Sequence, residues 1–295
     1  MITDNNKIAL ITGANSGIGK EATLQLAREG FHVVMVCRNE KRAQTAIKDI
    51  KNSYPEASLD LFIADMAELN AIRTMVNKFK TAYDHLDVLI NNAALFDITQ
   101  KQRNLTSEGL ETIWATNHLG PVLLTTLLLE SLMQSKEGRI LNIASKGLLA
   151  KPFLKVDLKD PEFENRAFNV VNAYYQSKIA QIMYTYWLSK QLSTTNISVN
   201  CFRVPAVKVD IDRYPDLSSF MKWVYKQKAK AAASPTSIAN NYVYWASHQW
   251  DNKPNGKYFD EKNNYVKGNK YIEKEENIQD VMGLTKSYIP EWKDF

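Results

Sequence analysis

The sequence predicts a doubly wound α/β fold, in which helices cover both faces of a parallel sheet. Strand-like and helix-like segments alternate from the start of the chain, which is typical of parallel βαβ units. Some of the strand-like segments, such as 31–37 (FHVVMVC), are nearly continuous apolar runs, as expected for strands buried on both faces. A glycine-rich turn also separates the first strand from the first helix.

Six segments are expected to form the sheet, because β-prone and apolar residues dominate them. The first of them reads KIALIT, and the third, SLDLFI, alternates apolar and polar residues at period two. The expected strands are 7–12, 31–37, 58–63, 87–91, 139–144 and 196–202.

The segments between the strands place apolar residues at helical spacing. The first helix has Ile18, Ala22 and Leu26 on one face, and the second is charged and amphipathic. The segment 108–134 is long and apolar, and we expect a bend near Pro121, whose ring disfavours a continuous helix. The expected helices are 17–29, 40–51, 68–83, 108–134, 173–192 and one near 235–248.

Two long connections, 147–172 and 205–234, follow the carboxyl ends of strands, where open α/β sheets bind ligands. Either they pack as a minor hydrophobic cluster, or they form the lid and wall of a site for a lipophilic substrate. Their apolar residues are Leu148, Leu149, Phe153, Leu154, Phe168, Phe220, Trp223 and Tyr225.

Composition narrows the class of protein. The 295 residues are 45% hydrophobic and 23% charged, which excludes a disordered or collagen-like chain and allows one sizeable core. Lys and Arg number 37 and Asp and Glu 32, so the net charge is +5. This modest, dispersed excess is weak support for nucleic-acid binding, which we do not expect.

Neither metal binding nor membrane insertion is expected. Cys37 and Cys201 lie in apolar strand-like runs and are predicted to be buried free thiols, with no Cys/His cluster for a metal. The N-terminus MITDNNK lacks the apolar core of a signal peptide. The apolar stretch 119–133 is too short to span a bilayer, so we expect no integral membrane segment and a cytoplasmic location.

The turn Thr12-Gly13-Ala14-Asn15-Ser16-Gly17-Ile18-Gly19 is suited to a dinucleotide pyrophosphate. Gly13 allows a tight turn, Gly17 allows close approach of the backbone to phosphate, and Gly19 allows close packing of helix on strand. The helix N-terminus then presents amides and a positive dipole end to the anion. The candidate phosphate contacts are Gly13, Asn15, Ser16, Gly17, Ile18 and Gly19; the alternative is a glycine-rich turn that binds no nucleotide.

The end of the second strand indicates which dinucleotide is bound. An NAD site usually has an acidic residue there, whereas this chain has Arg38, which can form a bidentate contact with a 2′-phosphate. We therefore predict NADP(H); the alternative is a solvated basic start of a helix. Asp65, followed by Met66, is placed to bond the adenine amino group, and Asn92 lies where the fourth strand ends beside the ribose.

These residues resemble the short-chain dehydrogenase/reductase family over about 7–260. The matching motifs are TGANSGIG (12–19), NNAA (91–94), TNHLG (116–120), RILNIAS (139–145) and YYQSK (174–178). GANSGIGKEA, VCRN and TNHLGPVLLT are most similar to the retinol-dehydrogenase-like branch, which favours NADP(H). The resemblance implies a single Rossmann-type domain, with 1–140 mainly cofactor-binding and 141–295 catalytic and substrate-binding.

Three positions depart from the family pattern. The family's NNAG reads NNAA, so Ala94 fits only if the backbone there has no positive φ. The family's Pro-Gly after the sixth strand reads Pro205-Ala206, and a Thr that contacts the nicotinamide end is replaced within Val207-Lys208-Val209. By position, we assign Pro205 and Val207 to the cofactor site. Members of this branch often have an N-terminal membrane anchor, for which this chain starts too close to its first strand.

Tyr174 and Lys178 are spaced i,i+4 on one helix and so share a face. A free tyrosine has a pKa near 10, and an ammonium ~4 Å away would stabilise its phenolate by about 4 kcal/mol before desolvation. Tyr174 is therefore the candidate acid/base, and Lys178 can also bond the nicotinamide ribose. Tyr175 does not fit this spacing and is interpreted as structural.

Ser145, at the end of the fifth strand, can donate a hydrogen bond to the substrate oxygen. The resemblance implies that Asn117 completes the set by organising a helix carbonyl and a water beside the lysine. His118 has no second feature to support catalysis and is given a packing role.

The sequence thus predicts an NADP(H)-dependent oxidoreductase that acts on a small-molecule alcohol or carbonyl. A non-catalytic NADP(H)-binding sensor or scaffold remains the alternative. A nucleotide-sugar epimerase or dehydratase fits less well, because it would typically show TGxxGxxG and a larger C-terminal domain. The long apolar helices 108–134 and 173–192 suggest a homo-oligomer, either dimer or tetramer.

Overall fold

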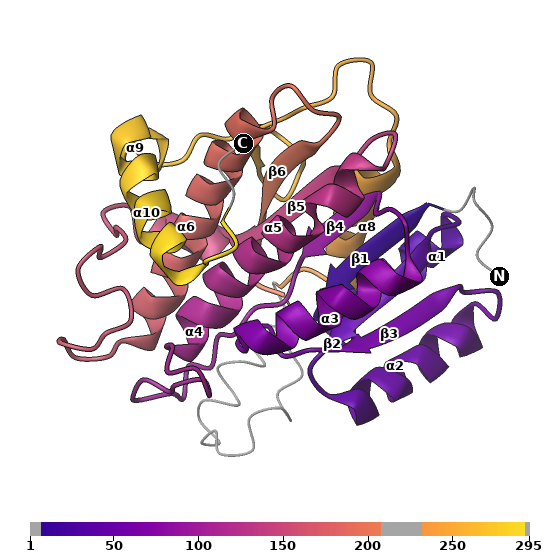
Figure 1. Ribbon diagram of the computed structural model, residues 1–295, viewed down its shortest axis with the longest axis horizontal. Coiled ribbons are helices and arrows are strands. Elements are labelled where there is room, and N and C mark those ends of the chain that lie inside the picture. Colours follow the sequence, from indigo (N-terminus) through magenta and orange to yellow (C-terminus); the bar gives the residue numbers. More distant parts are fainter. Residues whose placement is uncertain (1–6, 208–231, 293–295) are drawn as a thin grey trace.

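A seven-stranded parallel sheet forms the centre of the computed structural model, which describes residues 7–207 and 232–292 (Figure 1). The strand order is β3-β2-β1-β4-β5-β6-β7, and Leu10 of β1 pairs with both Val34 of β2 and Leu89 of β4. The order therefore reverses between β1 and β4, which creates the crevice where doubly wound sheets bind ligands. The predicted fold class is confirmed.

The strands lie close to their predicted positions. Only β6 shifts by two residues, because the Thr195 hydroxyl accepts a bond from the Ile197 amide and keeps that segment in a turn. A seventh strand of three residues was not predicted. The strands are β1 (Ile8–Thr12), β2 (His32–Cys37), β3 (Leu59–Ile63), β4 (Val88–Asn91), β5 (Arg139–Ser145), β6 (Ser198–Val204) and β7 (Lys257–Phe259).

Helices cover both faces of the sheet. One core contains apolar side chains of α1, α2 and α8 with Ala9 and Ile11 of β1, and the other contains those of α3, α5, α6 and α10 with Ile8 and Leu10. The period of two along β1 thus supplies both cores. The helices are α1 (Gly17–Arg28), α2 (Glu40–Ser53), α3 (Leu69–Ala82), α5 (Gly120–Met133), α6 (Val170–Gln191), α8 (Pro235–Ser247), α9 (Lys270–Glu273) and α10 (Glu275–Tyr288).

The predicted helix 108–134 is divided. It begins only at α4 (Thr112–Trp114), where the buried Glu111 carboxylate accepts hydrogen bonds from the first amides, and continues as the π-helical turn η1 (Ala115–Leu119) into α5. Pro121 has no N–H to donate to the carbonyl four residues earlier, that of Asn117, so the α-helical ladder is interrupted there. At the predicted bend the chain forms a π-helical turn, which ends two residues before Pro121.

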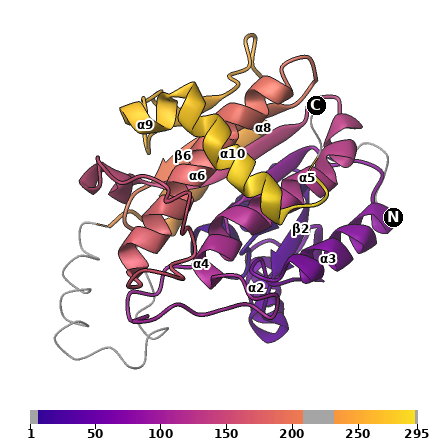
Figure 2. The same ribbon diagram turned by 60° about the vertical axis from the view of Figure 1, so that its left-hand side comes forward.

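The C-terminal helix α10, which was not predicted, lies across α6 (Figure 2). Ile278, Val281 and Met282 are buried on its inner face. It therefore completes the core on this side of the sheet.

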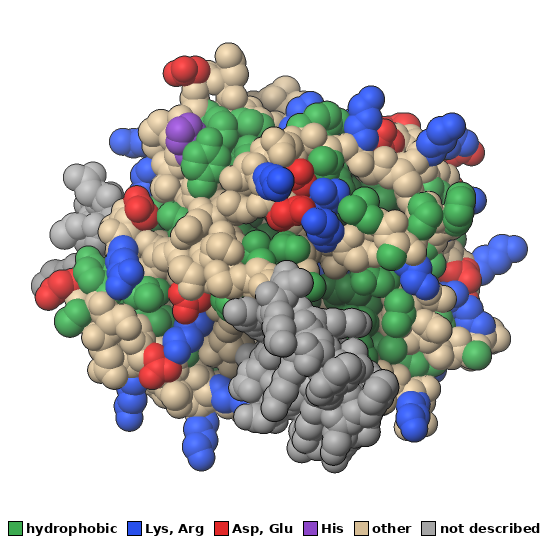
Figure 3. All heavy atoms as spheres, turned by 180° about the vertical axis from the view of Figure 1, so that it is seen from behind, with side chains coloured by type: hydrophobic (Ala, Val, Ile, Leu, Met, Phe, Trp, Pro, Cys, Tyr) green, Lys and Arg blue, Asp and Glu red, His purple; other side chains and the backbone are tan. Residues whose placement is uncertain are grey.

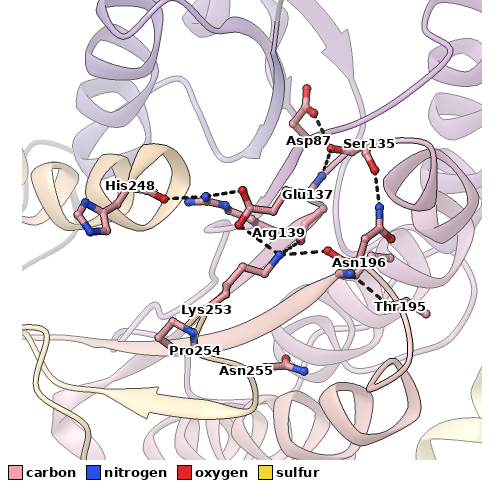
Figure 4. A network of polar contacts seen from close by, with 12 residues as sticks. Asp87, Ser135, Glu137, Arg139, Thr195, Asn196, His248, Lys253, Pro254 and Asn255 are labelled. Atoms are coloured by element: carbon pink, nitrogen blue, oxygen red, sulfur yellow. Dashed lines mark hydrogen bonds and ion pairs between the residues drawn. The ribbon is translucent and has the colours of Figure 1, made fainter. Parts of the chain in front are cut away.

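The amino ends of the strands are held by a polar network (Figure 4). Arg139, at the start of β5, is 3% exposed and donates to the main-chain carbonyls of Trp245 and His248. Lys253 pairs with Glu137 and donates to the carbonyl of Asn196. This network ties the loops together at the edge of the sheet opposite the carboxyl ends.

The first long connection contains one short helix. It begins as a 3-10 helix, η2 (Lys146–Ala150), and ends at Val170, because the Asn169 side chain caps α6 three residues before the predicted start. The second connection lies mostly outside the described residues, and Phe220, Trp223 and Tyr225 with it.

Basic and acidic side chains are interspersed on the face shown in Figure 3. Both cysteines are buried free thiols, as predicted. In the ranges 7–207 and 232–292, no helix has the length and apolar character that crossing a membrane requires, and no three His, Cys, Asp or Glu residues gather as a metal site.

Candidate active site

The glycine-rich turn after β1 has the geometry that its three glycines suggest. Gly13 and Gly17 have φ of +68° and +56°, a conformation that other residues rarely adopt. A Cβ on Gly19 would lie 2.3 Å from the Gly13 carbonyl oxygen, so only glycine lets α1 start this close to the strand. Ser16 is the N-cap residue, and Asn15 and Ile18 flank the start of α1. The turn thus directs the N-terminus of α1 toward the crevice.

Asn92 joins this turn to the end of β4. Its side-chain amide donates to the Thr12 carbonyl at 2.8 Å, and its side-chain oxygen accepts from the Tyr242 hydroxyl at 3.3 Å. The Thr12 hydroxyl in turn accepts from the amides of Asn92 and Ala93, at 3.1 and 2.9 Å. The polar atoms of the Asn92 side chain therefore serve mainly to hold the two loops beside one another.

The departures from the family pattern fit the backbone. Among the described residues other than glycine, only Phe163 and Asn263 have positive φ, so the alanines at 94 and 206 are unstrained. Val207 forms a bridge with Ala233 just beyond Pro205.

The residues predicted to contact the adenosine half lie at the ends of β2 and β3. Arg38 is exposed and lies directly after β2. It occupies the position where an NAD site usually has an acidic residue. Asp65 accepts a hydrogen bond from the Ala67 amide at 2.9 Å, which fixes the loop after β3. The buried Met66 lies beside the start of α5. A Cβ on Gly120 would come within 2.2 Å of the Met66 carbonyl oxygen, so a glycine is needed for this close approach.

Tyr174, Lys178 and Ser145 meet where β5 ends against α6. The Ser145 side chain lies beside the Tyr174 phenol, and the Lys178 ammonium lies 5.9 Å from the centre of the Tyr174 ring. Phe96, from the loop after β4, stacks on Tyr174 with ring centres 4.3 Å apart. Two hydroxyls and one ammonium are thus brought together at the carboxyl edge of the sheet.

Burial dominates the electrostatics of this group. It raises the pKa of Tyr174 to about 12, against the opposing effect of the Ser145 side chain, and it lowers the pKa of Lys178 to about 8. The sequence suggested that Lys178 would lower the pKa of Tyr174. The structure differs, because the ammonium bonds to the Ile143 carbonyl at 2.7 Å and the Gln181 side-chain oxygen at 3.1 Å. Tyr174 is therefore a protonated phenol at neutral pH.

Asn117 lies in the π-helical turn and is fully buried. Its side chain accepts from the Leu95 amide at 2.7 Å and donates to the Leu95 carbonyl at 3.0 Å and to the Ser177 hydroxyl at 3.1 Å. Ser177 donates to the Tyr174 carbonyl at 2.7 Å. Asn117 thus connects the loop after β4 to the helix that carries Tyr174.

His118 packs in the core and does not face the site. Its ring lies 4.6 Å from that of Trp114, and its Nε2 atom is 2.8 Å from the Thr285 hydroxyl of α10. Complete burial lowers the pKa of His118 to about 3, so the ring is neutral. The Tyr175 hydroxyl lies against Gly147, where a Cβ would come within 2.0 Å of it.

Three residues of this site were missed in the sequence. Phe96 lies in a loop and Gly147 in the short helix η2, neither of which has a periodic pattern, and Gln181 is one of many polar residues on α6. The position of Phe96, shortly after the polar end of β4, is a weak signal of a site residue. The role of Gln181 depends on a contact that only the fold reveals.

Known proteins resemble this chain in sequence and in fold. Residues 7–154 match the short chain dehydrogenase family model. Human retinol dehydrogenase 13 is 32% identical over 263 residues, which cover 86% of this chain and 76% of that protein. An uncharacterised Mycobacterium paratuberculosis protein is similar in structure, with a TM-score of 0.70, 22% identity and coverage of 95% and 92%. So is a Shigella flexneri short-chain dehydrogenase solved with NADP, with a TM-score of 0.65, 22% identity and coverage of 88% and 98%.

The match to the family model and the identity to retinol dehydrogenase 13 together show the family. The chain belongs to the short-chain dehydrogenase/reductase family of oxidoreductases, in its retinol-dehydrogenase-like branch.

Proposed function

We propose that this protein transfers a hydride between NADP(H) and an alcohol or carbonyl group of a lipophilic small molecule, with Tyr174 as the acid/base. The observation that carries this proposal is the grouping of Ser145, Tyr174 and the buried Lys178 ammonium where β5 ends against α6. Two neighbouring hydroxyls suit one substrate oxygen, since Ser145 can orient it while Tyr174 gives or takes its proton.

The residues present fit a dinucleotide. Positive φ at Gly13 and Gly17 and the absence of a side chain at Gly19 leave the cradle that a pyrophosphate needs. The exposed Arg38 guanidinium, with Lys41 and Arg42 close by in the sequence, favours a 2′-phosphate over a bare ribose. The nicotinamide would supply the hydride, which is chemistry that no side chain offers.

The protonated phenol can supply the proton that reduction of a carbonyl requires. A phenol with a pKa near 12 holds its proton at neutral pH, which is the form needed to protonate a carbonyl oxygen as it becomes an alkoxide. Lys178, with a pKa near 8, is largely charged at neutral pH and would stabilise the phenolate that remains. Asn117 and Ser177 position this part of α6.

A lipophilic substrate is supported by the loop after β5. Leu148 and Leu154 pack against the core, and Phe168 belongs to a small cluster with Phe163, as the packing alternative expected. Leu149 and Phe153 instead project outward, with 62% and 92% of their surface exposed. These two exposed side chains lie close to Ser145 in the sequence. They contribute little to the core, and their exposure is more consistent with contact to an apolar ligand.

The test is the reduction of a panel of aldehydes and ketones, from short-chain to retinoid and steroid compounds. The reaction is monitored through the oxidation of NADPH. We expect turnover to be greatest for apolar carbonyls. Tight NADPH binding without reduction of any of them would favour the sensor or scaffold alternative, and failure to bind NADPH would contradict both.

A further inference from the structure

Two oxygen atoms accept hydrogen bonds from the Lys178 ammonium. The side chain is 1% exposed, and its nitrogen donates to the Ile143 carbonyl of β5 and to the Gln181 side-chain oxygen, three residues along α6. The first acceptor is backbone and does not depend on side-chain identity. The second exists only because position 181 is an amide.

The buried position of Gln181 is energetically unfavourable for a polar side chain. Its side chain is fully buried, and its NH₂ group has no hydrogen-bond partner within the described part of the chain. An ammonium can only donate, so the amide must turn its oxygen toward Lys178 and leave the NH₂ group unpaired. A leucine of similar size would avoid this desolvation penalty. The advantage of an amide at this position is therefore its hydrogen bond with Lys178, which an apolar residue cannot form.

Buried polar contacts fix this stretch of α6 on the sheet. The Thr185 hydroxyl donates to the Gln181 carbonyl at 3.0 Å and accepts from the Asn142 side chain of β5 at 3.0 Å. Asn142 in turn accepts from the Asn91 side chain of β4 at 2.9 Å. Gln181 therefore has little freedom to move away from the ammonium.

We propose that Gln181 is a positioning residue for Lys178: its side-chain oxygen holds the ammonium at the end of β5 and favours the charged form. This inference rests on the proposed function only for its consequence for turnover. The groups that face Lys178 are Tyr174 on α6 and the Cys201 thiol on β6, both neutral near pH 7 because burial raises their pKa values. The Gln181 oxygen is then the only side-chain acceptor that the described residues give to the ammonium.

The test measures the titration of Lys178 directly. Protein labelled with ¹³C at lysine Cε is titrated by NMR without added cofactor, and the Lys178 signal is assigned by its loss in Lys178→Met. The unmodified protein should titrate near 8. Gln181→Leu removes the acceptor and should lower the midpoint by about one pH unit, whereas Gln181→Glu adds a negative charge and should raise it by at least as much.

Ser189→Ala is the matched control. It removes a buried polar contact about two turns further along the same helix, and it should lower stability without moving the Lys178 midpoint. Unchanged midpoints in both Gln181 variants, or equal shifts in Ser189→Ala, would overturn the proposal. If Gln181→Leu does not fold, the direction of the shift in Gln181→Glu decides.

A second measurement separates this inference from the proposed function. The dissociation constant of NADPH is followed by fluorescence from pH 6 to 9.5 in the same variants. If Lys178 contacts the cofactor, affinity should weaken with rising pH at the midpoint seen by NMR, and that midpoint should move with Gln181. Absence of NADPH binding by the unmodified protein would contradict the proposed function, while the NMR midpoints would still decide the role of Gln181.

Discussion

The side-chain amide of Asn117 donates to the Ser177 hydroxyl, 3.1 Å away, and so ties the π-helical turn to the helix of Tyr174. The same asparagine satisfies both the amide and the carbonyl of Leu95. One buried side chain thus fixes three segments around the site.

Asn117→Ala should therefore cost far more stability than Ser177→Ala. The first leaves the Leu95 backbone groups unpaired and should lower the free energy of unfolding by about 2–4 kcal/mol. The second removes one hydrogen bond from Asn117, which keeps its bonds to Leu95, and should cost about 1 kcal/mol. Urea unfolding followed by circular dichroism measures both, and equal losses would contradict this account.

Tyr174→Phe should lower turnover by roughly 10²–10⁴-fold, because the ring and its stack on Phe96 remain while the transferable proton is lost. The affinity for NADPH should change little, whereas Lys178→Ala should reduce both turnover and binding. Tyr175→Phe is the control and should keep the chemistry intact. A Tyr174→Phe protein with unmodified turnover would refute the assignment of the acid/base.

Arg38→Asp should reverse or abolish the preference for NADPH over NADH. A charge-assisted contact with the 2′-phosphate is worth about 1.5–3 kcal/mol, so NADPH affinity should fall roughly 10–100-fold. Lys51→Asp makes the same change of charge at the far end of α2 and should leave the preference in place. Calorimetry with both cofactors measures the outcome; equal binding of NADH and NADPH by the unmodified protein would contradict the prediction.

His118 should make the protein sensitive to acid. Its pKa is about 3 in the folded protein and 6.5 ordinarily, so below pH 6.5 the unfolded chain takes up a proton that the folded chain does not. The free energy of unfolding should therefore fall with pH from 6.5 toward 3, by up to ~1.4 kcal/mol per pH unit from this group.

His118→Phe keeps a ring against Trp114 and should reduce that slope by about one proton. Urea unfolding at pH 7, 5.5 and 4.5 compares the two proteins; identical slopes would show that His118 titrates in the folded state as it does in the unfolded chain.

A homo-oligomer, either dimer or tetramer, is also expected from the long apolar helices α5 and α6. In the structure, α10 covers part of α6, so the contact would use the remaining surface of this layer. Light scattering at micromolar concentration measures the mass, and a value near 33.7 kDa would contradict the prediction.

The sequence predicts those features that depend on local chemistry. Gly13, Gly17 and Gly19 could be assigned because positive φ and close packing exclude other residues, and the apolar strands could be assigned because both their faces are buried. The strand β7 has only three residues and is set by its pairing with Cys201 and Phe202, which no local pattern reveals. Likewise α10 gains its stability from packing on α6.

The electrostatics of the site depend on contacts that spacing does not give. The i,i+4 relation of Tyr174 and Lys178 is visible in the sequence, but the acceptor at Ile143 lies 35 residues before Lys178, on strand β5. Because the ammonium turns toward that carbonyl and Gln181, burial controls the pKa of Tyr174. The site residues could thus be nominated from the sequence, whereas their protonation required the fold.

The contact between His118 and Thr285 spans 167 residues and bears on how the protein matures during synthesis. The turn that holds Asn117 leaves the ribosome long before α10 exists to pack against it. Until then the ring of His118 and the side of α6 that packs against α10 lack their cover. This layer of the core can therefore be completed only after α10 has been translated.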